Sequence, residues 1–190
     1  MPFGVGSLNL KSNQIIMVVG KRGMGKSTLV RWLLKRFQRA GVDVFVYNTS
    51  QEKEYQPFPH YTPKEIDSLM EFEEIAERIW KKGNIVFVVE EVDLFASPHF
   101  ISPMLKRLVS SGRHRNIGLI LTTRRVWDVH KLICSQVHHW FFFQSLELGY
   151  SVIYLKKFIG EIAEKLKDIP PYYFLYVGAN ETRMFKPLRV

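Results

Sequence analysis

The chain is poor in cysteine and has no long apolar run. It contains one cysteine, Cys134, so no disulfide can form within the chain. Cys134 lies in an apolar helical context, where we expect a buried thiol. No apolar stretch approaches the roughly 18 residues that a membrane helix needs, and the N-terminus lacks the charged and apolar regions of a signal peptide. These absences predict a cytosolic protein.

Repeats, low-complexity tracts and Gly/Ser linkers are also absent, and acidic residues are in the minority. A hydrophobic content of 46% over 190 residues suffices for one domain, residues 1–190, with helices on both faces of a central sheet. The chain carries 27 Lys and Arg against 18 Asp and Glu, a formal charge of +9. This excess of positive charge predicts an extended polyanion as a partner.

The sequence does contain a phosphate-binding motif. Residues 20–28 read GKRGMGKST, a complete G-x-x-x-x-G-K-[ST] pattern, between an apolar run at 15–19 and a helical pattern at 29–39. Its glycines let backbone N–H groups turn inward around a β-phosphate. The helix that begins near Lys26 directs the positive end of its dipole at the same anion. This context predicts a nucleotide site.

The side chains of the motif have expected roles in binding ATP and Mg²⁺. Lys26 would bridge the β- and γ-phosphates, Ser27 would offer its hydroxyl to Mg²⁺, and Thr28 would reach the α-phosphate or a backbone group. Lys21 and Arg22 occupy variable positions and are expected to be solvated charges that help to attract a polyanion. The expected ATP-binding segment is the whole motif: Gly20, Lys21, Arg22, Gly23, Met24, Gly25, Lys26, Ser27 and Thr28.

A pair of acidic residues forms the second element of the site. The β-branched and aromatic run 85–89 ends in Glu90 and Glu91. In nucleotide hydrolases of this architecture the first acid holds a Mg²⁺-bound water and the second polarises the attacking water. We therefore assign Glu90 to the metal and Glu91 to the general base, with Asp93 as an alternative for either. Adjacent strand residues face opposite ways, so a local bend must bring both carboxylates to the nucleotide.

Periodicity and helix breakers predict alternating strands and helices, which is typical of a largely parallel, doubly covered sheet. The expected strands are 14–19, 42–47, 85–89, 116–122 and 137–143, and residues 172–177 and 183–188 form a C-terminal hairpin. The expected helices are 26–39, 64–82, 103–110, 126–133 and 150–167, with a long loop at 49–63. With the phosphate loop, this order predicts an α/β P-loop NTPase fold of the RecA-like (ASCE) type.

Four segments together resemble the FtsK and HerA superfamily of DNA-pumping ATPases. They are the phosphate loop, the strand that ends in Glu90 and Glu91, the sequence GRHRNIG at 112–118, and LTTRR at 121–125 continuing to 135–136. The small size and the Gly-Arg-His triplet look most like the viral genome-packaging ATPases. The resemblance covers residues 14–143.

The resemblance implies a hexameric ring with ATP between subunits and double-stranded DNA in the pore. It also implies that the strand 116–122 lies between the two strands that bear the site. For a viral chain, the expected location is the host cytoplasm and a capsid or vertex protein is a further partner. The implied activity is Mg²⁺-dependent ATP hydrolysis, with Glu91, Lys26 and Arg113 as the catalytic residues.

Two of these roles belong to particular positions. Arg113 is similar in place to the arginine that such rings insert into the neighbouring subunit's site, and Arg115 is the alternative. Thr123 stands where the family usually carries a glutamine that senses the γ-phosphate. Because threonine is shorter, Thr122 and Arg124 are the alternatives for the sensor.

The function hypothesis is a motor that packages double-stranded DNA into a viral capsid. The alternatives are a cellular HerA-like translocase in DNA-end processing, a small-molecule or nucleoside kinase, and a nucleotide-dependent scaffold with little turnover.

Basic clusters at 106–107, 113–115, 124–125, 156–157 and 165–167 are candidates for DNA phosphate contacts, although many charge runs are solvated helix faces. The six histidines lack ligand-like spacing, so we expect no transition-metal site.

Overall fold

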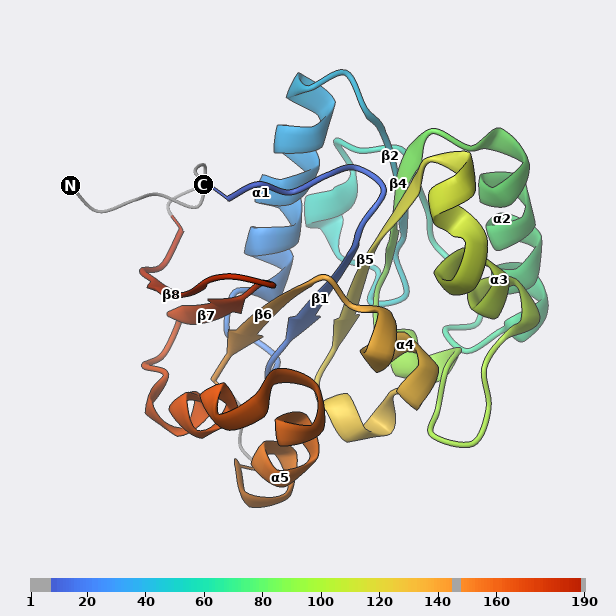
Figure 1. The fold of residues 1–190 in the computed structure, drawn as a ribbon. Coiled ribbons are helices and arrows are strands. Elements are labelled where there is room, and N and C mark those ends of the chain that lie inside the picture. The colour runs from blue at the N-terminus through green and yellow to red at the C-terminus, as the bar shows by residue number, and fades with distance from the viewer. Residues whose placement is uncertain (1–7, 145–147, 189–190) are drawn as a thin grey trace.

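The elements of the computed structural model, which describes residues 8–144 and 148–188, alternate between strand and helix (Figure 1). The strands are β1 (Ile15–Val19), β2 (Asp43–Tyr47), β3 (His60–Tyr61), β4 (Ile85–Val89), β5 (Ile117–Thr123), β6 (His139–Phe143), β7 (Phe174–Val177) and β8 (Thr182–Phe185). The α-helices are α1 (Lys26–Arg39), α2 (Leu69–Lys82), α3 (Pro103–Ser111), α4 (Lys131–Gln136) and α5 (Leu148–Ile159). Short 3-10 helices are η2 (Lys53–Tyr55), η3 (Val92–Leu94), η4 (Gly112–Arg115), η5 (Val126–Asp128) and η6 (Gly160–Asp168).

All eight strands form one sheet, in the order β3-β2-β4-β5-β1-β6-β7-β8. The strands from β3 to β6 in this order are parallel, whereas β7 and β8 are an antiparallel hairpin. The predicted fold class is confirmed, as is the position of β5 between β1 and β4. The carboxyl ends of β1, β4 and β5 consequently meet at one edge of the sheet, where α/β proteins bind their ligands.

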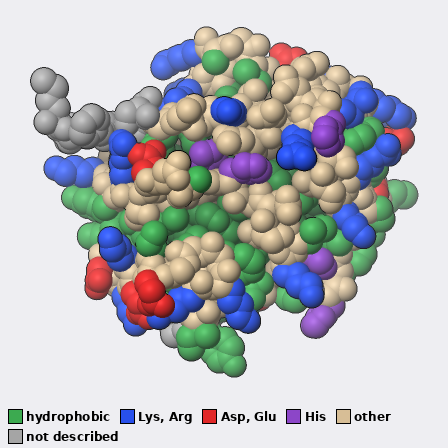
Figure 2. Space-filling model, in the orientation of Figure 1, with side chains coloured by type: hydrophobic (Ala, Val, Ile, Leu, Met, Phe, Trp, Pro, Cys, Tyr) green, Lys and Arg blue, Asp and Glu red, His purple; other side chains and the backbone are tan. Residues whose placement is uncertain are grey.

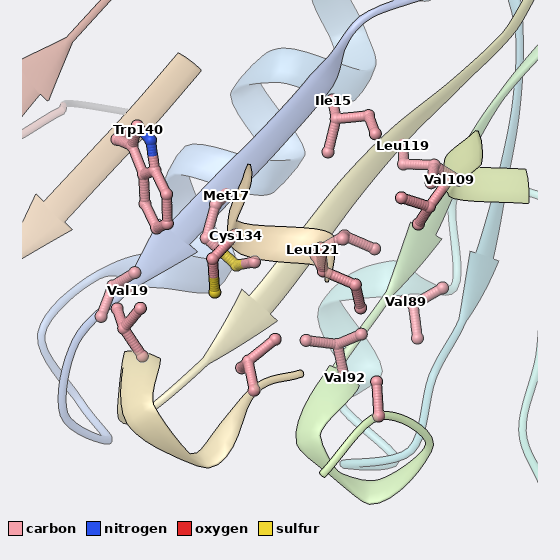
Figure 3. Packing of buried hydrophobic residues seen from close by; sticks show 14 of the residues in the cluster. Ile15, Met17, Val19, Val89, Val92, Val109, Leu119, Leu121, Cys134 and Trp140 are labelled. Carbon is pink, nitrogen blue, oxygen red and sulfur yellow. The ribbon is translucent and has the colours of Figure 1, made fainter. Parts of the chain in front are cut away.

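Both faces of the sheet are covered, which explains the unbroken apolar character of its central strands. Ile15, Met17 and Val19 pack with α2, α3, α4 and α5, whereas Ile16 and Val18 point to the other face and pack with α1. Figure 3 shows the first set of side chains together with neighbours from β4, β5, β6 and α4. A rigid, doubly packed sheet therefore supports the edge that carries the site.

Two predictions failed in the first half of the chain. The predicted loop at 49–63 contains η2 and the short edge strand β3, which pairs with the end of β2. The predicted helix 64–82 begins at Leu69, because the Ser68 hydroxyl accepts a hydrogen bond from the Glu71 amide and caps the first turn.

Two more failed in the second half. The predicted helix 126–133 is instead η5 followed by α4, with His130 Nδ1 accepting from the Leu132 amide at 3.2 Å before α4 begins. The predicted helix 150–167 ends as an α-helix at Ile159 and continues as η6, because Gly160 has a φ of +65°, which an α-helix does not allow.

The lone thiol behaves as predicted. Cys134 lies on the buried face of α4, and burial raises the pKa of its thiol to about 12 despite a hydrogen bond with the Tyr154 hydroxyl. Cys134 is therefore an inert core residue at neutral pH. Among the described residues, no helix is long and apolar enough to cross a membrane.

Candidate functional site

The loop between β1 and α1 has the backbone that the motif predicts. Gly20, Gly23 and Gly25 all have positive φ values, of 153°, 80° and 102°. A Cβ at Gly20 would lie 2.6 Å from the Phe143 Cβ, so space also requires a glycine there. Lys26 Nζ donates to the carbonyl oxygens of Gly20 at 2.7 Å and Lys21 at 2.9 Å. The Lys26 side chain thus folds back over the phosphate loop, which directly precedes α1.

A cavity of about 630 Å³ opens beside this loop at the carboxyl edge of the sheet. Its walls come from the phosphate loop, the segment after β2, and the ends of β4 and β5. The described residues that line it are Arg22, Gly23, Gly25, Lys26, Ser27, Thr28, Arg31, Thr49, Ser50, Gln51, Glu52, Glu54, Ile66, Glu90, Glu91, Thr122, Thr123 and Arg124. The phosphate loop, both predicted glutamates and all three sensor candidates therefore share one cavity.

Glu90 is deeply buried in this cavity wall. Its side chain and backbone are only 3% exposed, and burial together with the nearby charge of Glu52 raises the pKa of Glu90 to about 7. The Tyr55 hydroxyl and the Ser50 amide face the carboxylate and oppose this rise. Glu90 Oε2 is buried and makes no hydrogen bond within the described part of the chain.

These surroundings fit a bound cation. The Tyr55 hydroxyl lies beside both Glu90 and Ser27, so both predicted metal residues are near the same tyrosine. A divalent ion, or a water that it binds, would give the unpaired Glu90 oxygen a partner and would favour its charged form. Among the described residues, no group of three or more His, Cys, Asp or Glu side chains lies close enough together to hold a metal ion. Ser27 and Glu90 are therefore suited to Mg²⁺ that arrives with a nucleotide.

Glu91 makes the bend that the sequence requires. Its backbone is left-handed, with φ 48° and ψ 54°, which turns its side chain away from the strand alternation. The Glu91 amide donates to Thr122 Oγ1 at 3.1 Å and anchors the bend to β5. The carboxylate accepts a hydrogen bond from the Arg124 guanidinium and forms an ion pair with it. Both glutamates consequently reach the same cavity.

The side chains of Thr123 and Asp93 are hydrogen-bonded to each other. Thr123 Oγ1 donates to Asp93 Oδ1 at 2.8 Å and lies 3.0 Å from the Arg125 carbonyl oxygen. Thr123 is fully buried. The short side chain thus holds the end of β5 in place from the edge of the cavity.

The two arginines of the Gly-Arg-His segment differ in environment. Arg115 donates from Nε to the Trp80 carbonyl at 2.7 Å and from NH2 to the Lys81 carbonyl at 3.0 Å, so it caps the end of α2. Arg113 is exposed on η4, before β5. Because β5 is seven residues long, Arg113 lies about 20 Å from the nucleotide edge of its own subunit, at roughly 3.3 Å per residue.

The segment after β2 supplies site residues that sequence reasoning missed. Glu52 and Thr49 line the cavity, and the Thr49 hydroxyl donates to the Glu90 carbonyl at 3.1 Å. Tyr55 is completely buried next to Glu90. No motif marks these residues. Their position after a strand of the parallel sheet is the signal that would have placed them at this edge.

Much of the positive charge outside the cavity has local partners. Lys156 pairs with Glu161 and Glu164, and Lys167 pairs with Glu164. Arg107 lies over the Trp80 ring, with its guanidinium 4.2 Å from the ring centre. Figure 2 shows one face of the molecule, on which Lys and Arg side chains are scattered among other types. In the sequence clusters at 156–157 and 165–167, Lys156 and Lys167 are therefore engaged with acidic residues of η6.

Comparison with known proteins decides the family. A family model described as an AAA domain matches residues 9–127, which is more than half of the chain. The chain belongs to the AAA domain family. As an AAA domain it is a P-loop NTPase, in agreement with the cavity described above. No curated protein matches the chain.

Solved structures share the fold of this AAA domain. The DNA-packaging ATPase B204 of Sulfolobus turreted icosahedral virus superposes with a TM-score of 0.80 at 22% identity, over 95% of this chain and 100% of that one. The genome packaging NTPase B204 of Sulfolobus turreted icosahedral virus 2, in complex with ATP-gammaS, gives 0.79 at 19% identity over 95% and 100%. VirB4 of Thermoanaerobacter pseudethanolicus gives 0.71 at 11% identity over 92% and 89%. The predicted resemblance is confirmed at the level of fold.

Proposed function

We propose that this AAA domain is a Mg²⁺-dependent ATPase that translocates double-stranded DNA and packages a viral genome into a capsid. The observation that carries the enzymatic part is the meeting of Lys26, Ser27, Glu90 and Glu91 in one cavity at the carboxyl edge of the sheet. The fold shared with B204 over nearly the whole chain supports the packaging part.

In the proposed reaction, the phosphate loop holds the triphosphate through its backbone N–H groups. Lys26 exchanges the carbonyls of Gly20 and Lys21 for the β- and γ-phosphates. Ser27 and Glu90 would hold Mg²⁺, which neutralises phosphate charge when bound. The Glu91 carboxylate accepts a proton from the attacking water, which then displaces ADP from the γ-phosphorus in line.

The nucleotide base has a candidate subsite next to the phosphate loop. A hollow of about 110 Å³ shares Gly25 and Thr28 with the larger cavity. Its remaining walls are apolar or aromatic and include Met24 and the half-exposed Tyr172. A flat purine ring suits such walls, which carry few groups to distinguish adenine from guanine.

We propose that the active assembly is a ring, hexameric by the resemblance, in which Arg113 enters the neighbouring subunit's cavity. Its distance from the cavity of its own subunit argues against a role there in cis and is consistent with a role in trans. There a guanidinium would stabilise charge that develops on the γ-phosphate. Arg115 is the weaker candidate because its guanidinium already caps α2.

The proposed DNA contact uses phosphates rather than base edges, because a translocase has to grip any sequence. A net charge of +9 supports this partner. Affinity should then fall steeply as salt rises. Binding that does not change with salt would contradict a phosphate contact.

The decisive experiment is phosphate release from ATP with and without long double-stranded DNA at low salt. We expect DNA to stimulate phosphate release by wild type. We expect Lys26→Ala to release no phosphate with or without DNA. Lys21→Ala, at a half-buried loop residue that does not line the described cavity, is the matched loop variant and should keep most activity. Hydrolysis that ignores DNA would contradict the motor. A phosphorylated acceptor without free phosphate would indicate a kinase, and DNA binding with negligible turnover would indicate a scaffold.

The likeness in fold to VirB4 favours one second candidate, a cellular HerA-like translocase that acts in DNA-end processing. The chemistry is the same in both candidates. Uptake of DNA into purified empty capsids separates them, because only a packaging enzyme would drive it.

A further inference from the structure

Arg31 lies in the second turn of α1 and lines the nucleotide cavity together with Ser27 and Thr28. It follows Ser27 by four residues and Thr28 by three, and this spacing places the three side chains next to one another on the helix surface. Its Nη2 donates to Thr28 Oγ1 at 3.4 Å. The Arg31 guanidinium is therefore held against the threonine at the cavity wall.

The rest of this guanidinium has no partner in the described part of the chain. Its Nε is buried and makes no hydrogen bond there. None of the ion pairs between described residues involves Arg31, and α1 has no acidic residue in its first turn. A guanidinium has five N–H donors, and a buried donor without a partner costs free energy. Arg31 is consequently suited to an anion that enters the cavity.

The position of Thr28 indicates which phosphate this anion is. In the proposed reaction, Lys26 and Ser27 serve the β- and γ-phosphates and Mg²⁺. The candidate base subsite shares Thr28 with the large cavity. The α-phosphate joins the β-phosphate to the nucleoside, so it lies between the phosphate loop and this subsite. Arg31 is bonded to the residue at that point.

The other cationic side chains of the cavity are less suited to this role. Lys26 folds over the loop that would hold the β-phosphate, and Arg124 is paired with Glu91. Arg22 is exposed on the phosphate loop. Arg31 combines a fixed position beside Thr28 with a buried donor that has no partner in the described chain.

We propose that Arg31 binds the α-phosphate and thereby determines how tightly the site retains ADP, its product. The inference rests on the proposed ATPase function and adds a residue that acts on binding rather than on the chemical step. ATP and ADP both carry an α-phosphate, so the contact stabilises substrate, transition state and product to the same extent. Such a contact lowers KM for ATP and strengthens inhibition by ADP without raising kcat.

The test measures the affinity of Arg31→Gln for ATPγS and for ADP, together with its steady-state kinetics. Both affinities should fall by about tenfold, the scale of one hydrogen bond to a charged group. KM for ATP and the inhibition constant of ADP should rise by similar factors, and kcat should stay at or above the wild-type value. Arg31→Lys keeps the charge without the planar fork and should recover part of both affinities.

The matched control is Lys35→Gln, which removes a charge one turn further along α1, at an exposed residue outside the described cavity. It should bind both nucleotides like wild type. Thermal melts verify that Arg31→Gln is folded, and if it is not, the same comparison of ATPγS with ADP is made on Arg31→Lys.

Three results would overturn the inference and leave the ATPase proposal standing. A loss of affinity confined to ATPγS would place Arg31 at the γ-phosphate. Unchanged affinity for both nucleotides would show that the guanidinium does not touch them. A fall in kcat with KM unchanged would assign Arg31 to the chemical step. Failure of wild type to bind either nucleotide would overturn both proposals.

Discussion

Glu90 and Glu91 are adjacent in the chain but occupy opposite environments. Glu90 is buried beside Tyr55 with an unpaired oxygen, whereas Glu91 turns through a left-handed backbone to meet Arg124 at the cavity surface. The left-handed backbone at Glu91 lets both side chains reach one cavity, because regular strand geometry would send one of the two away from it. The two carboxylates should therefore respond differently to the same Glu→Gln change.

Glu91→Gln should abolish turnover and spare binding. Loss of a general base lowers kcat by about 10²- to 10⁴-fold, while the phosphate loop still holds the nucleotide. Steady-state phosphate release and ATPγS affinity measure the two effects. Glu54→Gln, at an exposed acid on the same cavity wall, is the control and should retain wild-type kcat. Wild-type turnover in Glu91→Gln would refute its assignment as the base.

Glu90→Gln should instead alter how stability depends on pH. Burial raises the pKa of Glu90 to about 7, from 4.5 for an ordinary glutamate, so between these values the folded protein binds more protons than the unfolded chain. The free energy of unfolding of wild type therefore falls as pH rises through this interval. The glutamine variant lacks this loss and should be more stable at pH 8 by roughly 3 kcal/mol, with little difference at pH 4.

Urea unfolding without nucleotide, at pH 4 and pH 8, measures this difference. The exposed Glu65→Gln is the control and should follow wild type at both values. A Glu90→Gln protein that is equally stable to wild type at pH 8 would show that the carboxylate is not buried as described.

Substitution of the two arginines of η4 should have different consequences, a loss of activity at Arg113 and a loss of stability at Arg115. Arg113→Ala should fold normally and reduce ATPase activity, and its subunits should depress the activity of wild type in mixed assemblies, because each would leave a neighbour's site incomplete. Arg115→Ala should lower the melting temperature instead, since two bonds to carbonyls at the end of α2 are lost. Thermal melts and mixing experiments distinguish them. Mixed assemblies whose activity follows the wild-type fraction alone would contradict a role in trans.

Gly118→Ala should destabilise the fold without touching the nucleotide site. A Cβ there would lie 2.1 Å from the Ser12 carbonyl oxygen, so the N-terminal segment would have to move away from β5. We expect a cost of about 2 kcal/mol or more, or a fall of at least about 5 °C in melting temperature for a chain of this size. Gly112→Ala is the matched control, because its nearest neighbour atoms would be 3.5 Å away in a helical backbone. A wild-type melting temperature for Gly118→Ala would contradict this packing.

Local signals explain which elements the sequence predicts well. The bounds of α1 are correct because Gly25 and Gly41, both with positive φ, stand just outside it. The bounds of β4 are correct because a continuous apolar run is what a strand buried on both faces requires. The phosphate loop and the glutamate pair follow from the same local order, and they locate the site at the carboxyl edge.

The remaining features depend on contacts between distant segments. The pairing of β3 with β2, and the burial of Tyr55 beside Glu90, arise when the chain after β2 folds back over the cavity. Polar residues and prolines in that segment predict a loop and give no such information. Arg124 follows β5 and Glu91 follows β4, so their pairing requires the strand order. Sequence periodicity does not reveal which strands are neighbours.

The length of β5 also bears on how the protein behaves at different concentrations. A rigid strand separates Arg113 from the cavity of its own subunit, so no side-chain motion can bring the two together. If the reaction needs both, a single subunit cannot complete its own active site. Specific activity would then climb with protein concentration and collapse on dilution, and dissociation would switch the hydrolysis off without any change in fold.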